Sequence, residues 1–137
     1  MIEVTSIYAA VLGLMFTAIT LRVALLRMSK KLSAGDGGDD QFAKLIRGHG
    51  NFAETVPIAL ILIALLELQG SSNFILHVLG SALVIGRISH YVQLTGLVKP
   101  LIFRKGGMVL TLGTIISASV RLLICLLYTS PSPRDRG

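Results

Sequence analysis

The sequence has little charge, a single cysteine and no tryptophan. Only 15% of its 137 residues are charged, whereas about a quarter are charged in ordinary soluble domains. One cysteine excludes a disulfide framework, and the 53% share of hydrophobic residues excludes a disordered chain. A soluble fold of this size, with a mean hydropathy of +0.75, would have too little polar surface to cover itself. We therefore predict an integral membrane protein.

Four apolar stretches are long enough to cross a bilayer as helices, which need about 20 residues each. They lie at residues 4–26, 52–68, 74–96 and 106–127. The sequence thus predicts an all-α, four-helix membrane domain over residues 1–128. The chain begins with Met-Ile-Glu, which lacks the basic residues of a signal peptide, so we expect the first stretch to be retained. Residues 129–137 are rich in proline, serine and arginine, and we expect a disordered or non-native tail there.

Lysine and arginine are concentrated in two of the three connections between the apolar stretches. The first connection contains six basic residues: Arg22, Arg27, Lys30, Lys31, Lys44 and Arg47. The third contains Lys99, Arg104 and Lys105, and the second, residues 70–73, contains none. Cytoplasmic loops carry an excess of lysine and arginine, so we expect both basic connections to be cytoplasmic and both termini to lie outside. The net charge of +6 then favours contact with anionic lipid and not with nucleic acid.

The first connection also contains an acidic, glycine-rich segment, Gly-Asp-Gly-Gly-Asp-Asp at residues 35–40. Its aspartates lack the spacing of a calcium loop, and the sequence has no phosphate-binding loop motif. We therefore interpret the segment as a solvated turn. No cluster of histidine, cysteine, aspartate and glutamate has metal-ligand spacing, and no metal site is predicted.

Two groups of polar residues interrupt the apolar pattern. The first group, a stripe at the start of the second stretch, consists of Arg47, Asn51 and Glu54. The second group shares one face of the third stretch and consists of Arg87, His90 and Tyr91. An ionisable side chain in the hydrocarbon costs about 2.5–3.5 kcal/mol. We therefore expect these groups to face the interior of the bundle, where they pair or line a wet cavity.

These polar groups have two interpretations. In the first, they form a cationic pocket that holds an anionic ligand through bidentate arginine contacts. In the second, Glu54 neutralises an arginine of another helix and Asn51 satisfies backbone carbonyls, so that the network only fixes how the helices pack. The residues alone leave both interpretations open.

Residues 47–54, Arg-Gly-His-Gly-Asn-Phe-Ala-Glu, are followed by Val56, Pro57 and a leucine-rich stretch. Together with Gly-Arg-Ile-Ser-His at residues 86–90, this pattern resembles the MAPEG proteins, the membrane-associated proteins in eicosanoid and glutathione metabolism, and among them the small bacterial branch. The resemblance covers about residues 1–127. It implies a left-handed four-helix bundle assembled as a homotrimer in a bacterial inner membrane. It also implies that glutathione binds between subunits near the cytoplasmic side.

The resemblance extends to the side chains of the glutathione site. Arg47, Asn51, Glu54 and Arg87 match positions that bind glutathione in the family. His90, which shares a face with Arg87, is grouped with these binding residues. Glutathione has two carboxylates and one amine, so several arginines and one glutamate complement its charge.

The resemblance further implies a catalytic arginine near the start of the fourth stretch, which stabilises the glutathione thiolate, the nucleophilic form. Arg104 is the candidate for this role. The thiolate would then attack a lipophilic electrophile that arrives from the bilayer. Eukaryotic catalytic members carry a tyrosine seven residues after the third-stretch arginine, where this sequence has Leu94. Tyr91, one turn earlier on nearly the same face, is the candidate substitute.

Two functions are compatible with the sequence. The first is a glutathione transferase or peroxidase that acts on lipophilic electrophiles. The second is a non-catalytic membrane protein that binds lipid or a partner, since the family includes such an accessory protein. Substituting alanine for Arg47 or Glu54 distinguishes the two functions. The first function predicts loss of glutathione binding in an intact trimer, whereas the second predicts weaker assembly, because breaking one side of a buried ion pair strands the other.

Overall fold

A chain inside a bilayer must satisfy its own backbone polar groups, and the α-helix does so within one segment. The computed structural model describes residues 1–128. It contains four helices: α1 (Val4–Lys30), α2 (Asp40–Leu68), α3 (Asn73–Leu94) and α4 (Ile102–Tyr128). Each is long and apolar enough to span a membrane, and the described residues contain no strand. The predicted all-α, four-span bundle is confirmed, while the expected tail at residues 129–137 lies outside the described residues.

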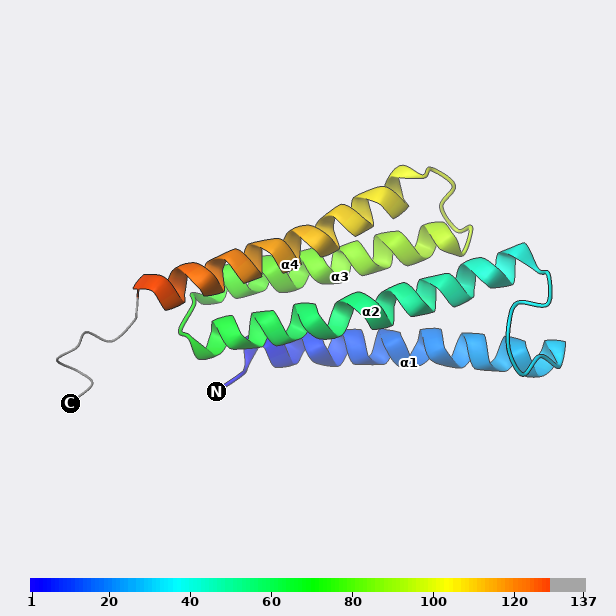
Figure 1. Ribbon diagram of the computed structural model, residues 1–137, viewed down its shortest axis with the longest axis horizontal. Coiled ribbons are helices and arrows are strands. Elements are labelled where there is room, and N and C mark those ends of the chain that lie inside the picture. Colours follow the sequence, from blue (N-terminus) through cyan, green and yellow to red (C-terminus); the bar gives the residue numbers. More distant parts are fainter. Residues whose placement is uncertain (129–137) are drawn as a thin grey trace.

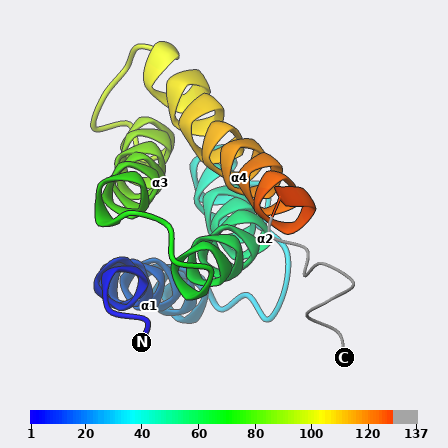
Figure 2. The same ribbon diagram turned by 90° about the vertical axis from the view of Figure 1, so that its left-hand side faces the viewer.

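The four helices run alternately up and down the long axis of the bundle (Figure 1). The α1–α2 and α3–α4 connections lie at one end, and the N-terminus and the α2–α3 turn lie at the other (Figure 1). Helices α1 and α4 each pack against both α2 and α3. Within residues 1–128, α1 and α4 make no contact with each other, and Figure 2 shows them on opposite sides of the bundle. Both basic connections therefore share one end of the molecule, here called the basic end.

Helix α2 begins at Asp40, twelve residues before the apolar stretch predicted from the sequence. Asp39 caps it, because its carboxylate accepts hydrogen bonds from the backbone N–H of Phe42 (3.1 Å) and from Lys30 Nζ (2.6 Å). The hydrogen bond from Lys30 is the main reason that the pKa of the Asp39 carboxyl lies below its usual value. Phe42 and Leu45 are buried in the bundle. The polar stripe predicted from the sequence therefore lies within one continuous helix.

At the end of the bundle opposite the basic end, Glu67, near the end of α2, joins α2 to the start of α1. Its carboxylate accepts hydrogen bonds from the backbone N–H groups of Glu3, Val4 and Thr5, each 2.7 Å long. The Thr5 hydroxyl donates a further hydrogen bond at 2.5 Å. The first N–H groups of a helix have no partner within the helix, and a negative charge there also complements the helix dipole. Glu67 thus satisfies the start of α1 and fastens it to α2.

Replacing Glu67 with glutamine is expected to lower the free energy of unfolding by about 2 kcal/mol, since hydrogen bonds to charged groups contribute about 1.5–3 kcal/mol. Glutamine keeps the length of the side chain but removes its charge and one of its two acceptor oxygens. Thermal unfolding in detergent measures the change. Glu3→Gln is the matched control, because the exposed Glu3 carboxylate accepts no hydrogen bond within residues 1–128. Equal melting temperatures for E67Q and the unmodified protein would contradict the capping role.

Candidate functional site

Two turns of α2 place an ion pair on the surface of the chain. Arg47 donates two hydrogen bonds to Glu54, from Nη1 to Oε1 at 3.3 Å and from Nη2 to Oε2 at 3.2 Å. The two side chains are 61% and 58% exposed. An ion pair this exposed to water contributes only about 0–1 kcal/mol. Because both side chains are exposed on the described chain, the pair is accessible to water, to a ligand or to another copy of the chain.

A second arginine, Arg87 of α3, lies inside the chain and is only 1% exposed. Its guanidinium donates from Nη1 to Asn51 Oδ1 (2.6 Å), from Nε to Thr111 Oγ1 (3.1 Å) and from Nη2 to Met108 Sδ (3.3 Å). Neither ion pair within residues 1–128 includes Arg87. Neutral dipoles from α2 and α4, and no carboxylate of the described chain, therefore stabilise this buried charge.

The hydrogen bond from Arg87 fixes how the Asn51 side chain is oriented. A guanidinium has only donors, so the amide oxygen of Asn51 must face it. The amide nitrogen is then left to donate elsewhere, and within residues 1–128 it has no acceptor. In the structural interpretation, Asn51 satisfies backbone carbonyls and Glu54 pairs with an arginine of another helix. In the structure, the Asn51 side chain instead accepts a hydrogen bond from Arg87, and Glu54 pairs with Arg47 of its own helix. The arrangement offers two N–H groups beside the exposed ion pair.

Two glycines bring α3 and α4 close enough to build the Arg87 network. A Cβ atom on Gly107 would lie 2.5 Å from the carbonyl oxygen of Gly86, so the two backbones touch where both side chains are absent. The hydroxyl of Thr111, one turn after Gly107, donates to the Gly107 carbonyl at 2.8 Å and accepts from Arg87. Thr111, Met108 and Gly107 were not predicted from the sequence. Glycine inside an apolar helix was the available signal, because it often marks a close approach of backbones.

His90 lies one turn after Arg87 and is 4% exposed. Three arginines are close enough to act on its charge, in decreasing order Arg87, Arg104 and Arg47. Three of the arginines predicted for the site, Arg47, Arg87 and Arg104, therefore lie in the neighbourhood of His90. Arg104, in the first turn of α4, is half-buried and forms no ion pair within residues 1–128. In the same residues, no group of three His, Cys, Asp or Glu side chains is placed to hold a metal ion.

Tyr91 and Leu94 both pack against Gly48 of α2. A Cβ atom at Gly48 would lie 2.9 Å from Leu94 Cδ1 and 3.5 Å from Tyr91 Cδ2. The Tyr91 hydroxyl is buried and has no hydrogen-bond partner within residues 1–128. Leu94, at the position of the family tyrosine, is 2% exposed. The catalytic role of Tyr91 stays a prediction, because no contact described here links its hydroxyl to the exposed ion pair.

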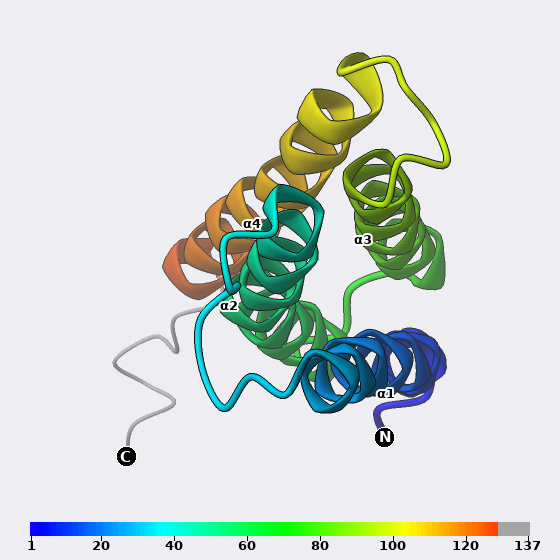
Figure 3. The ribbon, with the colours of Figure 1, turned by 90° about the vertical axis from the view of Figure 1, so that its right-hand side faces the viewer.

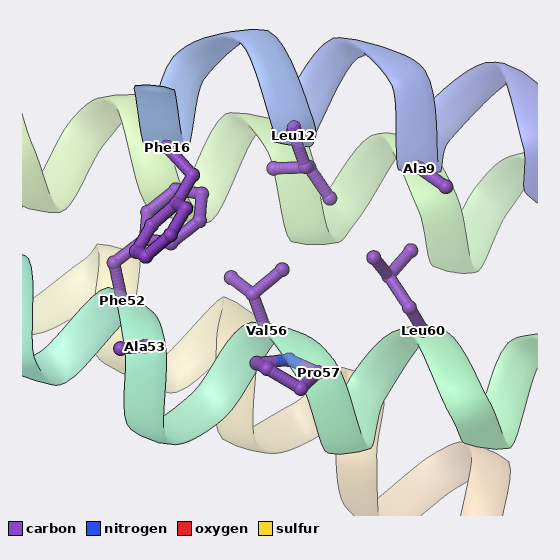
Figure 4. A pocket seen from close by; sticks show the side chains of 9 residues that line it. Ala9, Leu12, Phe16, Phe52, Ala53, Val56, Pro57 and Leu60 are labelled. Atoms are coloured by element: carbon purple, nitrogen blue, oxygen red, sulfur yellow. The ribbon is translucent and has the colours of Figure 1, made fainter. Parts of the chain in front are cut away.

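An apolar groove of about 300 Å³ lies between α1 and α2, next to the polar stripe. It is lined by Ala9, Leu12, Gly13, Phe16, Phe52, Ala53, Val56, Pro57 and Leu60. Figure 4 shows Phe16 and Phe52 facing each other at one end, with their ring centroids 5.6 Å apart. Because Phe52 and Ala53 lie between Asn51 and Glu54 in the chain, the groove begins at the level of the polar site. Its lining suits an apolar molecule.

Comparison with known proteins agrees with this architecture. The sequence profile of the MAPEG family matches residues 5–124. Two relatives, each named inner membrane protein YecN, come from Escherichia coli K12 and Escherichia coli O6:H1. Each is 35% identical over 88 residues, which is 64% of this chain and 67% of the relative. With four helices able to span a membrane, the protein is a multi-pass membrane protein, and it belongs to the MAPEG family.

Proposed function

We propose that this protein binds glutathione at the basic end of the bundle through Arg47, Asn51, Glu54, Arg87 and His90. The exposed Arg47–Glu54 ion pair, beside an Asn51 amide held in place by a buried arginine, is the observation that carries the proposal. Such a site presents a fork of N–H donors, a carboxylate and a free amide nitrogen. These groups complement a tripeptide that has two carboxylates, an amine and several carbonyl acceptors.

The exposure of the ion pair supports a site that lies between copies of the chain. Arg47 and Glu54 lie on a helix long and apolar enough to span a membrane, yet their side chains are more than half exposed. At this end of the helix the two side chains are open to a bound ligand and to a second copy of the chain. This agrees with the homotrimer that the family resemblance implies, with the basic end in the cytoplasm and the protein in a bacterial inner membrane.

The same geometry supports a reaction of glutathione with a lipophilic electrophile. A guanidinium such as that of Arg104, close to a bound glutathione, would favour the thiolate over the thiol. The thiolate sulfur would then form a bond to the electrophilic atom as that atom's bond to its leaving group breaks (in a peroxide, the O–O bond), and the leaving group departs with the electron pair and takes up a proton. The electrophile would reach the site through the apolar groove between α1 and α2. The protein would act in this way as a glutathione transferase or peroxidase.

One observation favours a second candidate function, a non-catalytic membrane protein that binds lipid or a partner. Leu94, which cannot donate a hydrogen bond, occupies the family tyrosine position and is buried. The nearby Tyr91 hydroxyl is also buried. The absence of the family tyrosine's hydroxyl group affects the chemical step more than it affects ligand binding, so glutathione binding is the property to test first.

Arg47→Ala is expected to weaken glutathione binding at least about tenfold, because a charge-assisted hydrogen bond contributes about 1.5–3 kcal/mol and about 1.4 kcal/mol corresponds to tenfold in affinity. Isothermal calorimetry on the detergent-purified protein measures the change. Arg22→Ala is the matched control, since Arg22 is an exposed arginine of α1 outside the proposed site. Size-exclusion chromatography confirms that each variant keeps its assembly. Absence of binding by the well-folded unmodified protein, or equal affinity in R47A, would overturn the glutathione site.

A further inference from the structure

An open apolar groove of about 320 Å³ runs between α3 and α4 at the basic end. Its walls are formed by Ile85, Ile88, Ser89, Val92, Val98 and Phe103. Ile85, Ile88 and Phe103 are 58%, 47% and 42% exposed, so nothing within residues 1–128 covers the groove. The α3–α4 connection that closes one end of it lies at the side of the bundle away from α1 (Figure 3).

Two hydrogen bonds hold the α3–α4 connection in place beside the groove. Ser89 Oγ donates to the backbone carbonyl of Phe103 at 2.6 Å. Gln93 Nε2 donates to the backbone carbonyl of Lys99 at 3.4 Å. Both donors belong to α3, and both acceptors belong to the connection or the start of α4. The shape of the groove is therefore fixed by the chain itself, before any ligand binds.

Three cations are close in sequence to residues of the groove walls, and none of the three itself lines the groove. Lys99 follows the wall residue Val98 in the chain, and Arg104 and Lys105 follow Phe103. No aspartate or glutamate occurs between residues 68 and 128. None of these three basic side chains forms an ion pair within residues 1–128. The chain thus places an uncompensated positive charge beside an apolar groove.

The charge pattern favours an anionic phospholipid over a second copy of the chain as the occupant. The α1–α2 connection is also basic, but it contains three aspartates between residues 35 and 40 and a Lys30–Asp39 ion pair of 2.6 Å. The α3–α4 connection has no such compensation. Two copies packed face to face through this groove would bring two cationic surfaces together, which is unfavourable. A phospholipid with a negative headgroup instead brings an acyl chain for the groove and a counter-charge for the lysines.

We propose that the α3–α4 groove is a specific binding site for an anionic phospholipid. One acyl chain lies along Ile85 and Ile88, and the lipid phosphate contacts Lys99 and Lys105. The bound lipid supplies the negative charge that α3, α4 and their connection lack. The groove walls share no residue with the proposed glutathione site, so the lipid site holds whether or not glutathione binds.

The absence of tryptophan from the sequence allows a direct test. Phe103→Trp places a single fluorophore in the groove wall, and the protein is reconstituted in vesicles that contain brominated phosphatidylglycerol or brominated phosphatidylcholine. Quenching is expected at a lower mole fraction of phosphatidylglycerol than of phosphatidylcholine. Leu14→Trp, on the exposed surface of α1 with no lysine or arginine within seven residues of it in the sequence, is the control for non-specific lipid contact and is expected to show no preference. Ile88→Trp reads the same groove if F103W fails to fold.

Removing the lysines identifies the source of the preference. K99Q/K105Q in the F103W background is expected to reduce the ratio of the two binding constants about fivefold for each lysine, following the attraction of a basic side chain to an anionic surface. K31Q/K44Q removes the same charge from the other basic connection and is expected to leave the ratio unchanged. Equal quenching by both lipids, an unchanged ratio in K99Q/K105Q, or a groove that neither lipid reaches because a second copy covers it would each overturn the proposal.

Discussion

Replacing Gly107 with alanine is expected to lower the free energy of unfolding by about 3 kcal/mol, because overpacking forces α3 and α4 apart. A Cβ atom at Gly107 would lie 2.5 Å from the Gly86 carbonyl oxygen, 2.7 Å from the His90 backbone nitrogen and 2.9 Å from His90 Cβ. None of these atoms is the end of a flexible side chain, so the helices themselves must move. Thermal or denaturant unfolding in detergent measures the loss.

Gly113→Ala, further along α4, is the matched control for this prediction. Apart from its chain neighbours and the nearby backbone of its own helix, no heavy atom of the described chain lies within 4 Å of the position that its Cβ would take, and alanine is favoured over glycine inside a helix by about 0.5–1 kcal/mol. G113A is therefore expected to be as stable as the unmodified protein or more stable. Separation of the helices in G107A also lengthens the 3.1 Å hydrogen bond between Arg87 and Thr111. Unchanged stability of G107A would rule out the backbone contact.

The number and type of helices could be predicted from the sequence because the bilayer leaves so few alternatives for a long apolar run. The start of α2 could not. Residues 40–51 mix charged and apolar side chains, so a hydropathy pattern gives no apolar run there. They become helical because Asp39 caps the first turn and because Phe42 and Leu45 are buried. The cap is a local signal that the hydropathy pattern does not register, whereas the burial of Phe42 and Leu45 depends on the packing of the other helices.

The candidate site was predictable only where its residues share a helix. Helical periodicity placed Arg47 and Glu54 on one stripe, and their side chains form an ion pair. The partners of Arg87 could not be predicted in this way, because Asn51 and Thr111 belong to other helices and no spacing rule relates them to Arg87. Their positions follow from how the helices pack, which rests on close glycine contacts. The assembly of the protein and its direction in the membrane remain predictions from the family resemblance and the distribution of charge.

Asn51→Leu is expected to lower the free energy of unfolding by about 3 kcal/mol, because it leaves a buried cation without its acceptor on α2. That acceptor makes the shortest hydrogen bond of Arg87, at 2.6 Å, and Arg87 is 1% exposed. Leucine is larger than asparagine and offers no lone pair. Reversible unfolding in mixed micelles measures the loss.

The double variant N51L/R87M is expected to be more stable than N51L, because replacing both polar partners with apolar groups removes the stranded charge. A double-mutant cycle with R87M alone is expected to give a coupling energy of about 0.5–3 kcal/mol. Thr114→Val supplies the control cycle with N51L. The Thr114 hydroxyl donates to the Leu110 carbonyl at 2.8 Å and not to the Arg87 network. The two losses should therefore add in that control cycle, whereas additive losses for N51L and R87M would contradict the coupling.

The same double variant separates folding from ligand binding. N51L/R87M keeps the exposed Arg47–Glu54 pair but loses the oriented amide and the buried cation behind it. If glutathione is bound as proposed, the variant folds and binds glutathione at least about tenfold more weakly, because the lost contacts contribute about 1.5–3 kcal/mol. If it binds glutathione with the affinity of the unmodified protein, Asn51 and Arg87 only hold α2, α3 and α4 together. The ligand would then rest on the exposed ion pair, and the contribution of the buried network would be to hold that pair's helix in position.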